Sequence, residues 1–204
     1  RKALLNDDLI DSIRLDEYVR YRYEESINDV PILDGEVGEE KRRRELAYLN
    51  LKWFMSTLLD RMDRASMYTG LEARVPYADH RIMEYVFNIP WSIKCKNGVV
   101  KHLLRKASGD LLPKSVLHRK KSPYPKTYHP GYEALVRERF MNVIADKNSP
   151  LLELIEPKKV NKFINSSFDY GKPWFGQLMA GPQMISYMLQ VNYWLNKYNI
   201  SIRV

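Results

Sequence analysis

The sequence is poor in cysteine and has no long hydrophobic segment. Cys95 is the only cysteine among 204 residues, which excludes an internal disulfide framework and is typical of a reducing compartment. Its thiol is interpreted as a bystander, with a nucleophilic role as the alternative. No apolar run approaches the roughly 18 residues that span a bilayer, and the N-terminus "RKALLNDDLI" lacks a signal-peptide hydrophobic segment. We therefore expect a cytoplasmic protein with no membrane partner and, because Arg1 replaces an initiator Met, a processed or truncated piece.

Three common signatures of catalytic or ligand-binding sites are also missing. The nine glycines never stand closer than three residues apart, so neither a P-loop nor a dinucleotide fingerprint can be written. No Gly-x-Ser-x-Gly elbow supports a hydrolytic triad. The histidines are too widely spaced for a metal signature, and one cysteine cannot build a thiolate site. These histidines are His80, His102, His118 and His129. We expect no metal ligands within this chain.

What the sequence does contain is a globular composition with excess positive charge. Hydrophobic residues make up 45% of the chain and aromatic residues 12%, which is enough apolar surface to offset the entropy of an ordered chain. The formal net charge is +8. Such a charge favours phosphate-bearing ligands, nucleic acid or an acidic partner, and does not choose among them.

Helix signals dominate the first part of the chain. Asn6 and Asp16 each precede apolar residues at helical spacing and are predicted to cap two short helices. The segment at about 38–69 has no Gly or Pro after its first residue and predicts one central helix, which Gly70 ends as a C-terminal cap. Apolar residues recur along it at three-to-four-residue steps. They include Leu46, Leu49, Trp53, Leu59 and Met62.

The basic run "KRRR" at 41–44 has two interpretations. It could bind nucleic acid, but Glu39 and Glu40 precede it and Glu45 follows, so a solvated helix face with ion pairs is favoured.

The second part of the chain also predicts mainly helical structure. "HRIMEYVFNI" reads as a helix stopped by Pro90, and Asn97-Gly98 as the centre of a turn. "KHLLRKASGD" reads as a helix with Leu103 and Leu104 inward, and Lys101, Arg105 and Lys106 at the surface or available to a ligand. Four prolines predict an ordered loop over 111–132. Helices complete the chain, with a possible strand only in the terminal "ISIRV".

Charged groups after the central helix are the candidate chemistry. Glu72 and Arg74 are two residues apart, so in an extended segment their side chains point the same way and could share a site. A mutual or neighbouring ion pair is the alternative. Lys101 opens a helix, where it either helps hold an anion or is simply solvated. Arg119, Lys120 and Lys121 are three like charges in a stiff loop, which repel unless an anion or a carboxylate intervenes.

Two long segments carry a family resemblance. "LLDRMDRASMYTGLEARVPYADHRIMEYV" and "NGVVKHLLRKASGDLLPKSVLHRKKSPYP" resemble the C-terminal synthetase domain of glutamine-hydrolysing asparagine synthetases. The similarity covers at least residues 46–126, and "EKRRRELAYLNLKWF" and "PWFGQLMAGPQMISYMLQVNYWL" extend it to most of the chain. In that family the domain activates aspartate with ATP as β-aspartyl-AMP and pyrophosphate. Ammonia from an N-terminal glutaminase domain then displaces AMP to give asparagine.

The resemblance assigns roles to eight residues. It implies that Lys101, in the family's K-x-x-L-R segment, neutralises charge near the α-phosphate and pyrophosphate, and that Glu72 is the second catalytic residue. Substrate or phosphate binding is assigned to Arg74, Arg119 and Lys121. A role in maintaining the fold of the motif is assigned to Asp63, Arg64 and Asp79.

The departures from the family imply an incomplete domain. The family's S-G-G-x-D-S and S-G-E-G-x-D-E segments, which bind ATP, supply Mg²⁺ carboxylates and provide a catalytic Glu, are absent from residues 1–204, as is its N-terminal cysteine nucleophile. Residues 1–204 are therefore expected to be the mainly α, distal helical lobe of an α/β synthetase domain. That domain is of the adenine-nucleotide-hydrolase-like, PP-loop ATP pyrophosphatase type, and its parallel-sheet half is absent.

Expectations for activity follow from that interpretation. The active-site segments are 70–81 and 97–126, and the main ATP and Mg²⁺ ligands belong to the missing half. The chain alone is expected to be inactive, and a homodimer is one expectation for the parent. Two alternatives stay open: a β-lactam-forming synthetase relative, and a basic helical module that binds nucleic acid.

Overall fold

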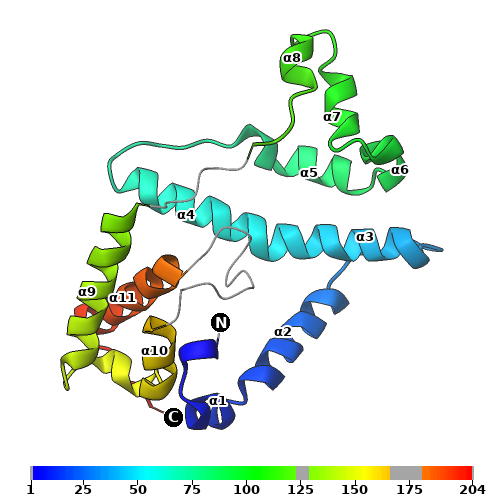
Figure 1. Ribbon diagram of the computed structural model, residues 1–204. Coiled ribbons are helices and arrows are strands. Elements are labelled where there is room, and N and C mark those ends of the chain that lie inside the picture. The colour runs from blue at the N-terminus through cyan, green and yellow to red at the C-terminus, as the bar shows by residue number, and fades with distance from the viewer. Residues whose placement is uncertain (1, 123–128, 166–180, 204) are drawn as a thin grey trace. The chain divides into compact units, whose positions relative to one another are not determined.

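The computed structural model describes residues 2–122, 129–165 and 181–203 (Figure 1). The described residues are mainly helical, which confirms the predicted class for this chain. Their β pairing is confined to one antiparallel bridge between Leu5 and Ile155, so the strand considered for "ISIRV" does not form over 200–203. Within these ranges, every helix is too short or too polar to cross a membrane.

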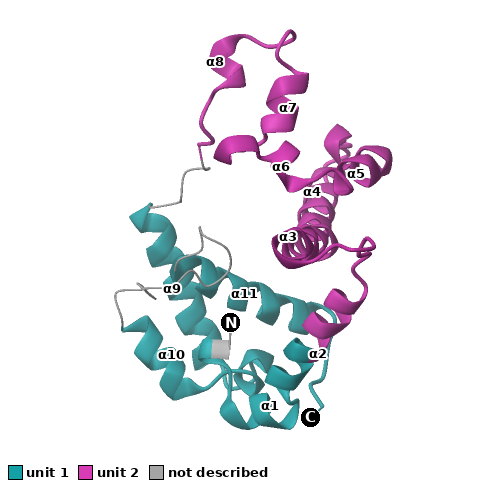
Figure 2. Cartoon of the chain, turned by 90° about the vertical axis from the view of Figure 1, so that its right-hand side faces the viewer, with its two compact units in different colours: residues 1–20, 123–204 teal, residues 21–122 magenta. Residues whose placement is uncertain are grey.

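The chain divides into two compact units, residues 1–20 with 123–204 and residues 21–122 (Figure 2). The first unit contains α1 (Asp7–Ser12), α9 (Pro130–Ala145), α10 (Pro157–Ile164) and α11 (Gly181–Lys197). Its helices surround a continuous apolar core. The buried members are Leu4, Val136, Phe140, Leu151, Ile155, Val160, Phe163, Ile164, Met184, Ile185 and Met188.

The predicted caps at the start of the chain have different outcomes. Asn6 caps α1, because its side chain accepts a hydrogen bond from the Asp8 N–H at 2.8 Å. Asp16 is not a cap, since α2 (Leu15–Asn28) begins one residue earlier, directly after Arg14 in a left-handed conformation. Asp16 instead lies in the first turn, where a negative charge suits the helix dipole.

In the second unit, a continuous helical run forms the predicted central helix and ends two residues before the expected limit. It consists of α3 (Gly38–Leu49), a π-helical segment (Asn50–Met55) and α4 (Ser56–Met67). Gly70 follows with φ +73°, and the Leu71 N–H donates to the Ser66 carbonyl at 3.0 Å. This is the left-handed glycine ending that the sequence predicted.

The π segment anchors the central helix to α2. The Trp53 indole N–H donates to the hydroxyl of the fully buried Ser26 at 3.0 Å, and the Lys52 ammonium lies 2.6 Å from the Asp29 carboxylate. Two consecutive residues of the π segment thus contact α2 and the residue that follows it, and Arg42 of α3 adds a hydrogen bond to the Tyr23 hydroxyl at 3.3 Å.

Apolar burial is sparse in the second unit. Among its described hydrophobic residues, Val30 alone is buried, and the predicted apolar stripe of the central helix is partly or largely exposed. Leu46 and Trp53, for example, are 45% and 44% exposed. Polar contacts therefore contribute more to the packing of this unit than an apolar core does.

Four short helices follow the central helix: α5 (His80–Phe87), α6 (Trp91–Lys94), α7 (His102–Ala107) and α8 (Lys114–Leu117). The predicted turn is present, with Asn97 and Gly98 at φ 54° and 72°. The prediction of one loop over 111–132 is wrong in part, because α8 follows Pro113 and α9 begins at Pro130. Proline lacks an N–H donor and is therefore tolerated at a helix start, where it is the first residue of α9 and immediately precedes α8. Residues 123–128 of the predicted loop lie outside the described residues.

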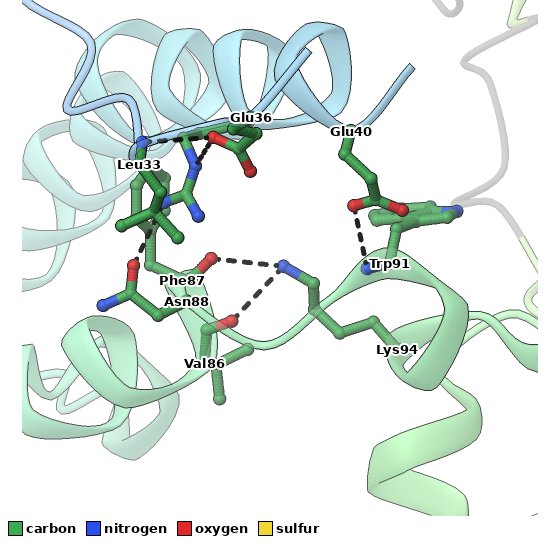
Figure 3. A network of polar contacts seen from close by, with 9 residues as sticks. Leu33, Glu36, Glu40, Val86, Phe87, Asn88, Trp91 and Lys94 are labelled. Carbon is green, nitrogen blue, oxygen red and sulfur yellow. Dashed lines mark hydrogen bonds and ion pairs between the residues drawn. The ribbon is translucent and has the colours of Figure 1, made fainter. Parts of the chain in front are cut away.

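A polar clasp, formed by Glu36, Glu40, Arg44, Asn88 and Lys94, joins α3 to the corner between α5 and α6 (Figure 3). The buried Arg44 guanidinium donates to the Glu36 carboxylate at 2.5 Å and to the Asn88 side chain at 3.0 Å. The Lys94 ammonium lies 3.3 Å from the Val86 carbonyl, in the last turn of α5, and Glu40 accepts from the first N–H of α6.

Hydrogen bonding and burial shift the pKa values of two groups in the clasp. The hydrogen bond from Arg44 holds the pKa of Glu36 below its ordinary value, and burial lowers the pKa of the Lys94 ammonium. The clasp satisfies backbone groups at the end of α5 and the start of α6, and this corner leads directly into the segment that carries Lys101.

Candidate functional site

A cationic hollow of about 700 Å³ lies between α7, α8 and the loop after α8. Its basic lining residues are Lys101, Arg105, Arg119, Lys120 and Lys121. Its apolar lining residues are Val100, Leu104, Leu112, Val116 and Leu117. Of the described residues that line it, none is Asp or Glu. Five cations without a neutralising carboxylate among them are an arrangement that attracts a multiply charged anion.

Two parts of the chain bring these cations together. Arg119, Lys120 and Lys121 follow α8, and Lys101 immediately precedes α7. The hollow thus unites Lys101 with Arg119 and Lys121, which the sequence analysis considered as a separate basic group. Leu104, predicted to point inward, is 40% exposed and lines this hollow instead.

Lys101 has an uncommon backbone conformation. Its φ of 58° and ψ of 34° are left-handed, and it is the N-terminal boundary residue of α7. For a residue with a Cβ, this conformation is higher in free energy than the right-handed one by about 1 kcal/mol or more. Asn97 has similar angles, but a turn before glycine commonly uses asparagine there, whereas lysine has no such local preference. The lysine is therefore held by its surroundings at a local cost in free energy.

Arg105 connects the walls of the hollow. Its Nε donates to the Val100 carbonyl at 2.9 Å, and its two terminal nitrogens donate to the carbonyls of Leu117 and Arg119. The sequence placed Arg105 at the surface or available to a ligand; the structure shows it half-buried and bonded to the protein backbone. No local sequence signal indicates these bonds, since two of the acceptors lie 12 and 14 residues further along the chain.

Glu72 and Arg74 lie outside the cationic hollow. They form a bidentate ion pair, with Nε and Nη2 of Arg74 each 3.0 Å from a Glu72 carboxylate oxygen. The side chains point the same way, as the extended spacing predicted, and they neutralise each other as the alternative interpretation held. Both are exposed, at 81% for Arg74 and 61% for Glu72.

The three residues assigned to fold maintenance have different surroundings. Arg64 pairs with Asp60 one helical turn earlier at 2.8 Å, and Asp63 is exposed on α4. Asp79 caps α5 by accepting from the Arg81 N–H at 2.9 Å. It also accepts two bonds from the Arg81 guanidinium, which lower the pKa of Asp79 to about 2.

Two alternative sites receive little support from the geometry. Arg42, Arg43 and Arg44 of the "KRRR" run each pair with a glutamate, which confirms the ion-pair interpretation, although Arg44 is buried rather than solvated. Within the described ranges, no three His, Cys, Asp or Glu side chains converge as a metal site would require.

Comparison with known proteins places the chain in a family. The family model for asparagine synthase matches residues 1–196. The chain belongs to the asparagine synthase family. Glutamine-hydrolyzing asparagine synthetase 3 of Bacillus subtilis (strain 168) is 47% identical over 203 residues, which are 99% of this chain and 33% of that protein.

Other members of the asparagine synthase family match shorter parts of the chain. Glutamine-hydrolyzing asparagine synthetase 1 of B. subtilis is 31% identical over 121 residues, covering 56% of this chain and 19% of that protein. The Homo sapiens glutamine-hydrolyzing asparagine synthetase is 39% identical over 88 residues, covering 42% of this chain and 16% of that protein. The chain thus spans at most a third of the length of these relatives.

Proposed function

We propose that this chain is the helical part of the synthetase domain of an ATP-dependent amidotransferase that makes asparagine from aspartate. The observation that carries the proposal is the cationic hollow, which unites Lys101 with Arg119 and Lys121 in a member of the asparagine synthase family. In the proposed reaction, a side-chain carboxylate oxygen of aspartate attacks the α-phosphorus of ATP and pyrophosphate leaves. Ammonia released from glutamine then attacks the acyl carbon and AMP leaves.

The proposed role of the hollow is to bind the phosphate groups of ATP. Negative charge builds up on the pyrophosphate oxygens as the bond to the α-phosphorus breaks, so a cation already in place stabilises the transition state. Lys101 suits this role because its constrained backbone fixes where the side chain starts. Arg119 and Lys121 supply further positive charge, and a planar guanidinium can bind two phosphate oxygens together.

Glu72 and Arg74 are proposed to act as a preformed pair. In this chain each satisfies the other, so a substrate or a further segment that binds one of them exchanges a solvent-exposed ion pair for a new contact. Such pairs contribute at most about 1 kcal/mol to stability, so breaking this pair requires little free energy. We propose that Glu72 orients the acyl-adenylate and that Arg74 contacts substrate. Asp63, Arg64 and Asp79 are proposed to support the motif, as the cap formed by Asp79 suggests.

The described residues fit part of the ATP-Mg²⁺ complex. The hollow offers cations to phosphate oxygens, but its described lining has no carboxylate for Mg²⁺, and the described ranges hold no group of three or more His, Cys, Asp or Glu side chains placed to bind a metal. The metal ligands are proposed to lie in the parallel-sheet half of a PP-loop type domain, outside this chain. For the same reason we propose that residues 1–204 alone are inactive.

A product assay on the complete protein tests this function. With ATP, aspartate and glutamine, the complete protein should form asparagine, AMP and pyrophosphate in equal amounts. Formation of ADP instead of AMP would contradict adenylation, and failure to amidate aspartate while another acid is consumed would favour the β-lactam-forming alternative.

A further inference from the structure

Arg105 donates hydrogen bonds to the protein backbone. All three guanidinium nitrogens donate to backbone carbonyls, at Val100, Leu117 and Arg119. Its side chain starts on α7, while two of its acceptors lie 12 and 14 residues further along the chain. These bonds use three of the five N–H donors of the guanidinium and fix its orientation, while its charge still contributes to the hollow.

The acceptor carbonyls are next to the cations that the proposed function uses. The Val100 carbonyl belongs to the peptide bond that leads into Lys101, and the Arg119 carbonyl belongs to the one that leads into Lys120. Arg105 therefore ties together the two backbone segments that carry the other cations. Since those segments bear like charges that repel each other, an empty hollow needs such a tie to keep its dimensions.

We propose that Arg105 is a positioning residue, which holds the left-handed Lys101 and the segment 117–121, at the end of α8 and after it, at the separation that a phosphate group requires. This inference rests on the proposed function for its ligand, but the tie itself is independent of any ligand. The planar fork of a guanidinium is essential to it, because one rigid group reaches three carbonyls in different directions. A lysine ammonium at the same position keeps the charge and loses that geometry.

Two variants of the chain separate geometry from charge. Arg105→Lys keeps the net charge and should lose most of the tie. Lys106→Met removes a charge from the next residue on the same helix, which is exposed and does not line the hollow, and serves as the matched control. Each variant is titrated calorimetrically with inorganic pyrophosphate at low ionic strength. In parallel, hydrogen exchange is followed at the amides of His102 and Arg119, which donate to Val99 and Val116 at 3.2 Å.

We expect Arg105→Lys to bind pyrophosphate at least about tenfold more weakly than the parent chain and to exchange both amides faster. Lys106→Met should change affinity less and leave both exchange rates unaltered. Wild-type affinity and exchange in Arg105→Lys would overturn the inference.

Failure of the proposed function gives a different pattern. If the parent chain shows no saturable pyrophosphate binding, the phosphate role of the hollow is contradicted, and the exchange rates decide the positioning role alone. Faster exchange confined to Arg105→Lys would support the tie, and equal rates in all three chains would refute it.

Discussion

Replacing Arg44 with methionine should strongly destabilise the unit formed by residues 21–122. The Arg44 and Glu36 side chains are only 6% and 13% exposed, so the substitution leaves a nearly buried carboxylate without its cation. It also removes the hydrogen bond to Asn88 and the stacking of the guanidinium over Phe87 at 4.9 Å. Breaking a buried ion pair by removing one partner typically costs about 3–5 kcal/mol. We expect about 3 kcal/mol, because Glu36 keeps its hydrogen bond from the Leu33 N–H and some access to water.

The neighbouring arginine provides the control. Arg43 lies on the same helix and also pairs with a glutamate, but its side chain is 32% exposed and that of Glu39 is 76% exposed. Arg43→Met should therefore cost no more than about 1 kcal/mol. Adding Glu36→Gln to Arg44→Met should recover part of the lost unfolding free energy, because the unpaired Glu36 carboxylate is replaced by a neutral amide. Urea unfolding followed by circular dichroism and tryptophan fluorescence measures all four proteins. Equal losses of unfolding free energy in Arg43→Met and Arg44→Met would refute the inference that the clasp stabilises this unit.

The pH dependence of the same pair has a definite sign. The hydrogen bond from Arg44 lowers the pKa of Glu36 from 4.5, so the unfolded chain takes up the proton first as the solution is acidified. The stabilisation is thus fully present above pH 4.5 and is lost as the pH falls through the lowered value. In Arg44→Met, burial without a partner should raise the pKa of Glu36, and acidification toward pH 4 should then stabilise the variant relative to neutral pH.

Three further predictions concern other parts of the chain. The Asp79 carboxyl should titrate near pH 2 by NMR, and Arg81→Ala should move the pKa of Asp79 toward 3.8. In the parent chain, the contribution of Asp79 to stability is lost as the pH falls from 3.8 to about 2. A titration midpoint near 3.8 in the parent chain would contradict the cap geometry. Gly70→Ala should lower the unfolding free energy by about 1–2 kcal/mol, because the φ of Gly70 is +73°. Gly109 has no left-handed φ, so Gly109→Ala should change the unfolding free energy less. Equal effects of the two substitutions in urea unfolding would argue against the glycine ending. The chain alone should self-associate as its concentration rises in sedimentation experiments, and a strict monomer would show that its exposed apolar residues do not drive association. Those of the second unit include Leu58, Met67, Tyr68, Leu71, Tyr77, Ile82 and Tyr85.

Local signals predicted the parts of the fold that depend on neighbouring residues. The Asn6 cap, the Gly70 helix ending and the Asn97-Gly98 turn all follow from conformational preferences within a few positions, and all are present. The prolines at 113 and 130 were misinterpreted because proline breaks a helix internally but begins one readily, and sequence alone does not say which applies.

Long-range contacts could not be predicted from the sequence. Arg44 and Asn88 are 44 residues apart, and nothing in the "KRRR" run distinguishes the buried Arg44 from its less buried neighbours. Similarly, Arg105 reads as one more cation of a basic helix until its carbonyl acceptors are known. The apolar stripe of the central helix predicted a buried face, and its exposure depends on which surfaces are available to cover it.

Substitution of Lys101 in the complete protein tests the central claim most directly. Lys101→Ala removes the lysine that precedes α7, and Lys106→Ala removes one from the last turn of that helix; of the two, only Lys101 lines the cationic hollow. If Lys101 stabilises charge in the adenylation transition state, its loss should reduce kcat for aspartate-dependent AMP release by about 10²–10³-fold, while Lys106→Ala stays close to the parent protein. Retention of most of the turnover by Lys101→Ala would contradict the account.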